Sequence, residues 1–243
     1  MEQVDIQKYI ELYTNSYSLD QIKPLNNQTY KIFKVSGANI RIAHRSQTYE
    51  NALAFTKLEH FLKNNEYFYL IPLSTIKGTI VGFIVRGVLT SDYGTITRTT
   101  NYENKVPFMY GLDKSFTNYD NHKKCYPIIV CEGCKDCLTL KKIYPYVVAN
   151  NTSSMGLNKA ILRNITNKFL LVYDNDEAGI NGMNKDKDSL RNIGSYVDTV
   201  QIPEGYKDCT DCYINPKTLE YNKEDFIKLS KQIKRKLRSL YEI

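Results

Sequence analysis

The sequence predicts an α/β protein, with a parallel-sheet domain preceded by a smaller α+β subdomain. From Tyr126 onward, strand-like apolar runs alternate with helical segments, whereas the residues before that point combine short helices with hairpin strands. On these grounds the chain divides into an N-terminal subdomain (1–122), a parallel-sheet domain (123–217) and a basic C-terminal helix (218–243).

The composition is that of a folded chain. With 42% hydrophobic and 24% charged residues among 243, the chain can bury a core, which disfavours intrinsic disorder. No apolar run approaches the roughly 18 residues that a membrane span needs. The first residues have neither the basic nor the apolar region of a secretion signal. We therefore expect a cytoplasmic protein with no membrane partner.

The net charge of +7 is unevenly distributed along the chain. Basic residues exceed acidic ones in 70–125 and again in 218–243, whereas 126–217 is neutral and rich in carboxylates. A neutral block with many carboxylates between two basic blocks suits a polyanionic partner held beside a metal site. A modest surplus of lysine is also the ordinary property of a solvated surface.

The N-terminal elements are predicted from apolar spacing. Residues 2–13 predict a short helix, and 52–62 predict a second helix. Residues 30–35 and 40–42 alternate apolar and polar like two strands joined by a turn. A hairpin follows, with strands at 68–72 and 79–86 around Lys77-Gly78.

The parallel-sheet domain is predicted from buried strands separated by helices. Its strands are expected at 126–131, 146–149, 169–173 and 197–202, and its helices at 135–143, 158–165 and 177–193. Ligands of such sheets bind at the carboxyl ends of the strands.

Carboxylates follow three of these strands. Glu132 comes directly after the first, Asp174 and Asp176 after the third, and Asp208 just beyond the fourth. The outer residues of Asp-x-Asp share one side, so Asp174 and Asp176 can bind one hard cation. Carboxylates without neighbouring histidines suit Mg²⁺ or Mn²⁺. Taken singly, an acidic loop after a strand is more often a solvated turn.

Taken in order, these motifs resemble the topoisomerase–primase (TOPRIM) domain, over residues 126–215. The matching segments are Glu132-Gly133, Lys135-Asp136, Leu171-Val172-Tyr173-Asp174-Asn175-Asp176-Glu177-Ala178-Gly179 and Pro203-Glu204-Gly205-Tyr206-Lys207-Asp208. The resemblance implies catalytic roles for Glu132, Asp174 and Asp176. It also implies that these three residues and Asp208 hold the metal.

The resemblance extends upstream. Ile71-Pro72, Gly78, Ile80–Arg86 and Met109–Leu112 are similar to the N-terminal half of a bacterial-type primase core. The resemblance to primase cores implies that five basic or polar residues contact nucleic acid or nucleotide. These residues are Arg86, Arg98, Asn101, Lys135 and Lys207. Without the resemblance, Arg86 would be interpreted as an ordinary cation at a strand end.

The implied function is that of a primase catalytic core. Such a core synthesises short RNA primers on single-stranded DNA from ribonucleoside triphosphates, with Mg²⁺ or Mn²⁺. No cysteine precedes Cys125 and no Walker motif occurs, so a zinc-ribbon or helicase module is not expected. We therefore expect a replicative helicase or single-strand-binding protein as partner. We also expect a phage gene acting in the bacterial host cytoplasm.

Two other functions remain open. The same carboxylates can activate water in a TOPRIM-type metal-dependent nuclease. The chain can also be a non-catalytic replication factor that binds nucleic acid, with a metal bound by its cysteines.

The cysteines are the competing metal signal. Cys131, Cys134 and Cys137, with Cys209 and Cys212, have the spacing of zinc or iron–sulfur ligands. We interpret them as structural thiols, because Cys131 ends a buried strand and Cys137 lies within the next helix. A thiolate cluster would also compete with Glu132 for the same space. A metal cluster remains the alternative.

The C-terminal segment predicts an amphipathic helix. Phe226, Leu229, Ile233, Leu237 and Leu240 have helical spacing. Its basic residues are Lys231, Lys234, Arg235, Lys236 and Arg238. They can contact phosphates, but a packed helix with a solvated basic face is the simpler interpretation.

Overall fold

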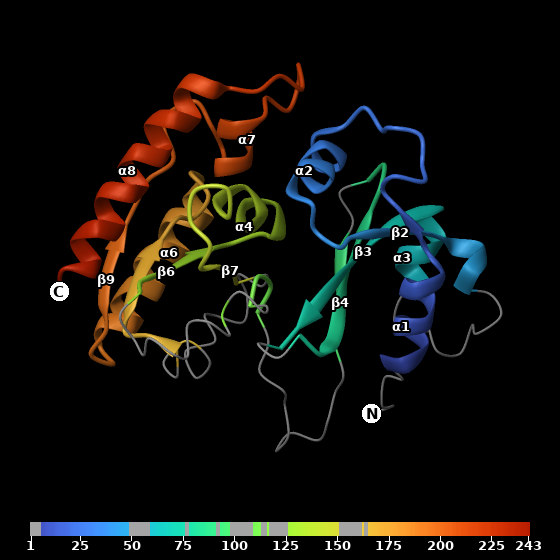
Figure 1. Ribbon diagram of the computed structural model, residues 1–243, viewed down its shortest axis with the longest axis horizontal. Helices are drawn as coiled ribbons and strands as arrows, with labels where there is room; N and C mark the ends of the chain where they lie inside the picture. The colour runs from blue at the N-terminus through green and yellow to red at the C-terminus, as the bar shows by residue number, and fades with distance from the viewer. Residues whose placement is uncertain are drawn as a thin grey trace. The chain divides into compact units, whose positions relative to one another are not determined.

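The computed structural model shows a chain that packs as two units (Figure 1). The described residues are 6–48, 59–75, 78–90, 93–97, 109–112, 116, 126–150, 162 and 165–243. The first unit consists of Met1–Pro24 and Gly37–Phe108, and the second of Leu25–Ser36 and Met109–Ile243. Among the described residues, no helix is both long enough and apolar enough to cross a bilayer.

The first unit is built on a five-stranded antiparallel sheet whose strands follow chain order. They are β1 (Tyr17–Ser18), β2 (Arg41–His44), β3 (Tyr67–Ser74), β4 (Ile80–Gly87) and β5 (Tyr93–Thr97). Helix α1 (Ile6–Asn15) packs on β2 and β4, and α3 (Glu59–Asn64) adds Phe61 to the same core. Tyr9, Phe68 and Phe83 are fully buried in this core.

Most predicted elements of the first unit are confirmed. β3 and β4 form the predicted hairpin, in which Tyr69 lies opposite Arg86. The helix expected at 2–13 is α1, within the described residues. The helix expected at 52–62 falls partly on 49–58, which lie outside the described residues, and its end is α3.

The strand expected at 30–35 is wrong, because these residues form helix α2 (Gln28–Ser36). Asn27 precedes the helix, and its side-chain Oδ1 accepts the Tyr30 amide at 2.7 Å. An asparagine that bonds an amide three residues on is a helix-start signal. Tyr30 and Phe33 are both buried, one helical turn apart, which the alternating pattern conceals.

The second unit contains a four-stranded parallel sheet in the order β7-β6-β8-β9. The strands are β6 (Ile128–Cys131), β7 (Val147–Ala149), β8 (Lys168–Leu171) and β9 (Tyr196–Thr199). All residues of β6 and β7 are buried, as expected for parallel strands covered on both faces. The predicted parallel α/β sheet is therefore confirmed.

Helices pack around this sheet (Figure 1). α4 (Cys134–Leu140) packs on β6 and β7, α6 (Glu177–Arg191) on β9, and α8 (Lys223–Tyr241) on β8 and β9. The short α7 (Cys209–Tyr213) lies against α4 and α8, and α2 also packs on α4. The helix expected at 158–165 falls mostly outside the described residues.

Helix α8 confirms the predicted amphipathic C-terminal helix. Leu229, Ile233, Leu237 and Leu240 are buried on one side of it. Its first turn contains Glu224 and Asp225, which interact favourably with the positive end of the helix dipole.

Candidate active site

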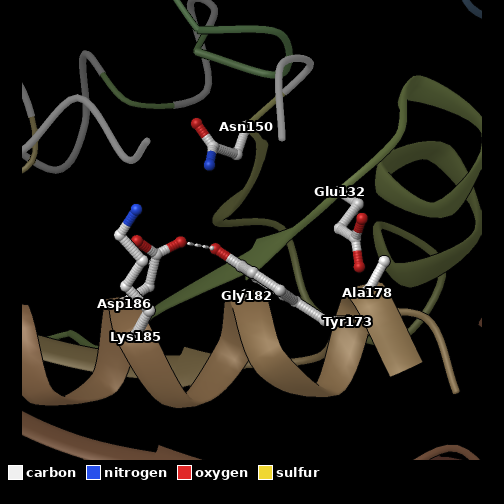
Figure 2. A pocket seen from close by; sticks show the side chains of 7 residues that line it. All are labelled: Glu132, Asn150, Tyr173, Ala178, Gly182, Lys185 and Asp186. Atoms are coloured by element: carbon white, nitrogen blue, oxygen red, sulfur yellow. Dashed lines mark hydrogen bonds between the residues drawn. The ribbon is translucent and has the colours of Figure 1, made fainter. Parts of the chain in front are cut away.

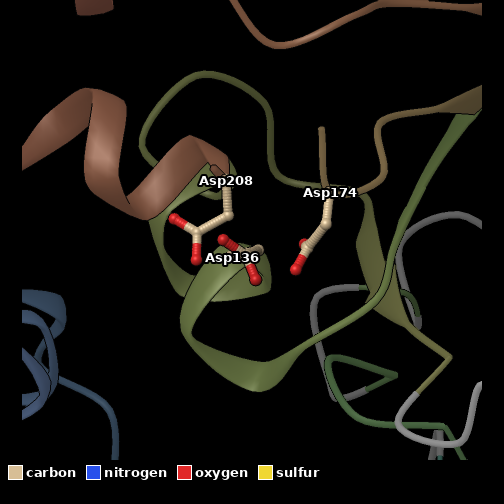
Figure 3. A group of neighbouring side chains, drawn as sticks. All are labelled: Asp136, Asp174 and Asp208. Atoms are coloured by element: carbon tan, nitrogen blue, oxygen red, sulfur yellow. The ribbon is translucent and has the colours of Figure 1, made fainter. Parts of the chain in front are cut away.

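Three aspartates converge at the carboxyl edge of the parallel sheet (Figure 3). Asp174 follows β8, Asp136 lies in the first turn of α4, and Asp208 is the N-cap of α7. Each offers a carboxylate oxygen within 4.8 Å of the oxygens of the other two. An all-oxygen donor set of this kind suits a hard divalent cation.

Hydrogen bonds at the starts of α4 and α7 hold two of these aspartates in place. Asp136 Oδ1 accepts the Thr210 amide at 3.2 Å and the Thr210 hydroxyl at 2.8 Å. The Cys209 thiol donates to the same oxygen at 3.2 Å. Asp208 Oδ1 accepts the Asp211 amide at 2.6 Å. Both carboxylates are buried, so their positions are set by the fold.

Glu132 and Asp176 lie beside this group, and each is tied to backbone. Glu132 Oε1 accepts the Asp174 amide at 3.0 Å. Asp176 is the N-cap of α6, and its Oδ1 accepts the Gly179 amide at 2.9 Å. Neither belongs to the group whose oxygens all lie within 4.8 Å.

Lys207 is the cation nearest to Asp174 and Asp176 among the described ion pairs. Its Nζ lies 3.8 Å from Asp174 Oδ2 and 3.6 Å from Asp176 Oδ2. The outer residues of the Asp-x-Asp motif therefore share one side, as predicted. The Lys207 side chain is 61% exposed, so an incoming anionic group can reach it.

Glycine at position 179 permits the close approach of α6 to the site. A Cβ on Gly179 would lie 2.3 Å from the Asp174 carbonyl oxygen and 2.7 Å from Glu132 Oε1. Both distances are shorter than the 3.0 Å below which Cβ atoms essentially never approach another heavy atom. Close packing therefore explains why a glycine follows the Asp-x-Asp motif at position 179.

Burial, and after it mutual repulsion, raises the pKa values of Asp174, Asp208 and Glu132. Burial, followed by the charges of Asp136, Glu132 and Asp208, raises the pKa of Asp174 to about 8. Burial and Asp136 raise the pKa of Asp208 to about 7. Burial also raises the pKa of Glu132. The carboxylate positions therefore fit a divalent cation, whose charge would offset this repulsion.

A pocket opens beside Glu132 on the α6 side (Figure 2). Asn150, which follows β7, and Lys185 from α6 also line it. The buried Tyr173 hydroxyl donates to Asp186 Oδ2 at 2.7 Å in its wall. Burial and Asp186 hold the pKa of Tyr173 above its ordinary value, so this hydroxyl stays a donor. The pair anchors the residue just before Asp174.

The remaining predicted contact residues are Lys135, Arg86, Arg98 and Asn101, and the charge of Lys135 lowers the pKa of Asp208. Lys135 Nζ donates to Gln28 Oε1 of α2 at 3.3 Å. Arg86 lies in β4 of the first unit. Arg98 and Asn101 lie outside the described residues.

Asp136 is the site residue to which the sequence assigned no role. It belongs to the Lys135-Asp136 segment, yet it joins the group of close carboxylates in place of Glu132 or Asp176. The available signal was its position in the first turn of a helix that begins at a strand's carboxyl end. Such a side chain points back toward that sheet edge.

The five described cysteines are all buried. The Cys131 and Cys137 thiols donate to the carbonyl oxygens of Val148 and Val147, each at 3.4 Å. Burial raises the pKa values of Cys131 and Cys209 well above their ordinary values, which disfavours the thiolate form that binds metals. That the cysteines are structural stays a prediction.

Comparisons with known proteins identify relatives of this fold. Residues 129–213 match the Toprim-like family. A DNA primase of Lactococcus lactis is 29% identical over 171 residues, which are 64% of this chain and 25% of that protein. The RNA polymerase domain of Mycobacterium tuberculosis primase DnaG superposes with a TM-score of 0.65 at 18% identity, covering 97% of this chain and 85% of that one.

A third relative was solved with a ligand. The DnaG primase catalytic domain bound to ssDNA has a TM-score of 0.62 at 18% identity, covering 96% of this chain and 77% of that one. The chain spans about a quarter of the length of the curated relatives it matches. The similarity in fold to the two solved structures thus includes residues of both units. The curated relatives are longer proteins.

The glycine contacts generate a test with a matched control. Gly179→Ala should lower the free energy of unfolding by about 1–3 kcal/mol, because its Cβ would meet backbone. Gly182→Ala lies in the same helix, and its Cβ would make only an ordinary contact, 3.8 Å from Tyr173 Cδ2. This control should raise stability by about 0.4–1 kcal/mol. Urea denaturation measures both, and equal stability of the two variants would contradict the packing argument.

The raised pKa of Asp174 generates a second test. In metal-free protein, its folded pKa of about 8 exceeds its ordinary value of 3.8. The folded state therefore binds more protons, and stability falls as the pH rises between these values. Asp174→Asn removes this pH-dependent destabilisation, so above pH 8 the variant should be more stable than wild type by about 0.5–2 kcal/mol.

The measurement is urea denaturation in chelator at acidic and alkaline pH. The exposed Asp188→Asn variant of α6 serves as control. Added divalent cation should reverse the order of wild type and Asp174→Asn, because it binds only the folded wild-type site. A wild type that is the more stable protein at alkaline pH without metal would contradict the repulsion argument.

The cysteine contacts predict that no metal is bound by thiolates. Elemental analysis of protein purified under reducing conditions and mildly chelated should find no stoichiometric zinc or iron. Cys134→Ser should leave the metal content unchanged. A bound metal that disappears only in this variant would restore the cysteine-cluster alternative.

Proposed function

We propose that this chain is a primase catalytic core, because residues 129–213 match the Toprim-like family and the fold resembles that of bacterial DNA primase cores. It would synthesise short RNA primers on single-stranded DNA by metal-dependent nucleotidyl transfer. The observation that carries the proposal is the cluster of Asp136, Asp174 and Asp208 at the sheet edge. Likeness to primases over both units favours primer synthesis over the nuclease alternative.

The proposed metal is Mg²⁺ or Mn²⁺, since all donors are carboxylate oxygens. Asp136, Asp174 and Asp208 would hold it, with Asp176 and Glu132 beside them. When bound, such an ion neutralises charge on the phosphate oxygens during in-line attack.

Glu132 is the proposed proton acceptor for the attacking 3′-hydroxyl. Its raised pKa makes it a stronger base than an ordinary glutamate. The hydrogen bond from the Asp174 amide to Oε1 orients its carboxylate. The pocket on its α6 side leaves that carboxylate reachable.

Lys207 is proposed to hold the triphosphate of the incoming ribonucleotide. It is exposed, and it stands 3.6–3.8 Å from the Asp174 and Asp176 carboxylates, within reach of a phosphate bound there. Arg86, Arg98, Asn101 and Lys135 are proposed further contacts to template or nucleotide. These roles carry over from the sequence resemblance.

Partners and context complete the proposal. A replicative helicase or single-strand-binding protein would raise primer synthesis by the 243-residue chain, whose local basic surplus is modest. The division at 122 and 217, a phage origin and a location in the host cytoplasm stay predictions.

Primer synthesis on single-stranded DNA with labelled ribonucleotides tests the function. Asp174→Ala and Asp208→Asn should each abolish short RNA products while the melting temperature is kept or raised, since each removes a repelling charge and asparagine can still cap α7. Asp188→Ala, on the exposed side of α6, should keep wild-type activity. Full synthesis by either site variant would overturn the proposal. Template degradation would favour a nuclease, and binding without products a non-catalytic factor.

A further inference from the structure

The outer face of α8 carries a stripe of basic side chains. Lys231, Lys234, Arg235 and Arg238 are all exposed. At about 100° per residue they fall within an arc of about 100°. The buried side of the helix faces the opposite direction, and its residues are Leu229, Ile233, Leu237 and Leu240. The stripe is therefore turned away from the core.

The structure separates these four residues from the fifth cation of the segment. Lys236 Nζ lies 2.9 Å from Asp198 Oδ2 and 3.1 Å from Oδ1, which ties α8 to β9. None of the other four has a side-chain hydrogen bond or ion pair with any described residue. Lys236 is thus structural, whereas the stripe is available to a ligand.

The stripe has dimensions that fit a nucleic-acid backbone. Lys231 and Arg238 are seven residues apart, which is about 10 Å along the helix axis. A strand with stacked bases rises about 3.4 Å per phosphate, so about three phosphates occupy that length. Exposed cations that are not organised into a pocket suit a flexible polyanion that contacts them in several registers.

The start of α8 is joined to the candidate active site within the same unit. The Tyr206 hydroxyl donates to Asp225 Oδ2 at 2.7 Å, and Asn222 Nδ2 donates to the Asp211 carbonyl at 3.1 Å. Tyr206 immediately precedes Lys207 and Asp208. Lys231 follows Asp225 by six residues, about 9 Å along the helix. The stripe thus begins a short distance along the helix from the turn that is bonded to the active-site loop.

Other acidic partners fit this face less well. A helix that binds an anionic membrane inserts its apolar side into the lipid. The apolar side of α8 is already buried against the sheet. An acidic protein segment would match only the charge of the stripe. Nucleic acid matches the charge and is also the proposed substrate of the neighbouring site.

We propose that Lys231, Lys234, Arg235 and Arg238 bind the phosphate backbone of single-stranded DNA that extends from the active site. The choice of nucleic acid as the polyanion rests on the proposed function. The surface adds an anchor for the template within the second unit, separate from the binding residues expected in the first.

The test is salt-dependent binding of a labelled single strand by the full-length chain. The quadruple variant K231Q/K234Q/R235Q/R238Q keeps helix propensity, because glutamine ranks with lysine and arginine. Each phosphate that the variant no longer neutralises should reduce the slope of log K against log salt by about 0.7, so three phosphates give about 2. Affinity at low salt should fall by about tenfold or more. K236Q is the matched control and should keep the wild-type slope.

The outcomes separate this surface from the proposed activity. Binding is measured in chelator and without nucleotides, so a chain that binds through the stripe but makes no primers would retain this proposal and remove the primase assignment. Circular dichroism verifies that both variants fold. An unchanged slope in the quadruple variant would overturn the proposal. So would tighter binding of polyglutamate or of phosphatidylserine vesicles than of DNA.

Discussion

Repulsion among carboxylates at the carboxyl edge of the parallel sheet is the constraint on which the second unit depends. Asp136, Asp174 and Asp208 come from three separate elements, and burial strengthens the repulsion among them. The fold holds them there with hydrogen bonds from Thr210, Cys209 and backbone amides. A divalent cation bound at this edge would offset the repulsion among these carboxylates.

The rest of the unit follows from this arrangement. α4 and α7 meet where their first turns present Asp136 and Asp208, and their packing fixes the distance between the two carboxylates. Gly179 lets α6 begin against Asp174 and Glu132. Tyr206, just before Lys207 and Asp208, donates to Asp225 of α8, and Asn222 at the start of α8 donates to the Asp211 carbonyl of α7. The carboxylate cluster, Lys207 and helix α8 thus share one framework.

The sequence predicted the features that repeat a simple pattern and missed those that depend on packing between distant segments. Buried strands such as Ile128–Cys131 and the Asp-x-Asp at a strand end could be predicted from the printed residues alone. Residues 30–35 alternate like a strand, and the Asn27 cap that makes them a helix was overlooked. The place of Asp136 depends on a hydrogen bond with Thr210, 74 residues away. The difference between Lys236 and its neighbours depends on Asp198, which periodicity along α8 does not reveal.

The central claim is that these three aspartates form one divalent-cation site. Anomalous diffraction from crystals of the full chain soaked in Mn²⁺ tests it most directly, because the metal then reports its own position. The account predicts a peak between the carboxylates of Asp136, Asp174 and Asp208 that disappears in Asp136→Ala. A peak at Cys131, Cys134 or Cys137 instead, or no peak at the sheet edge, would contradict it.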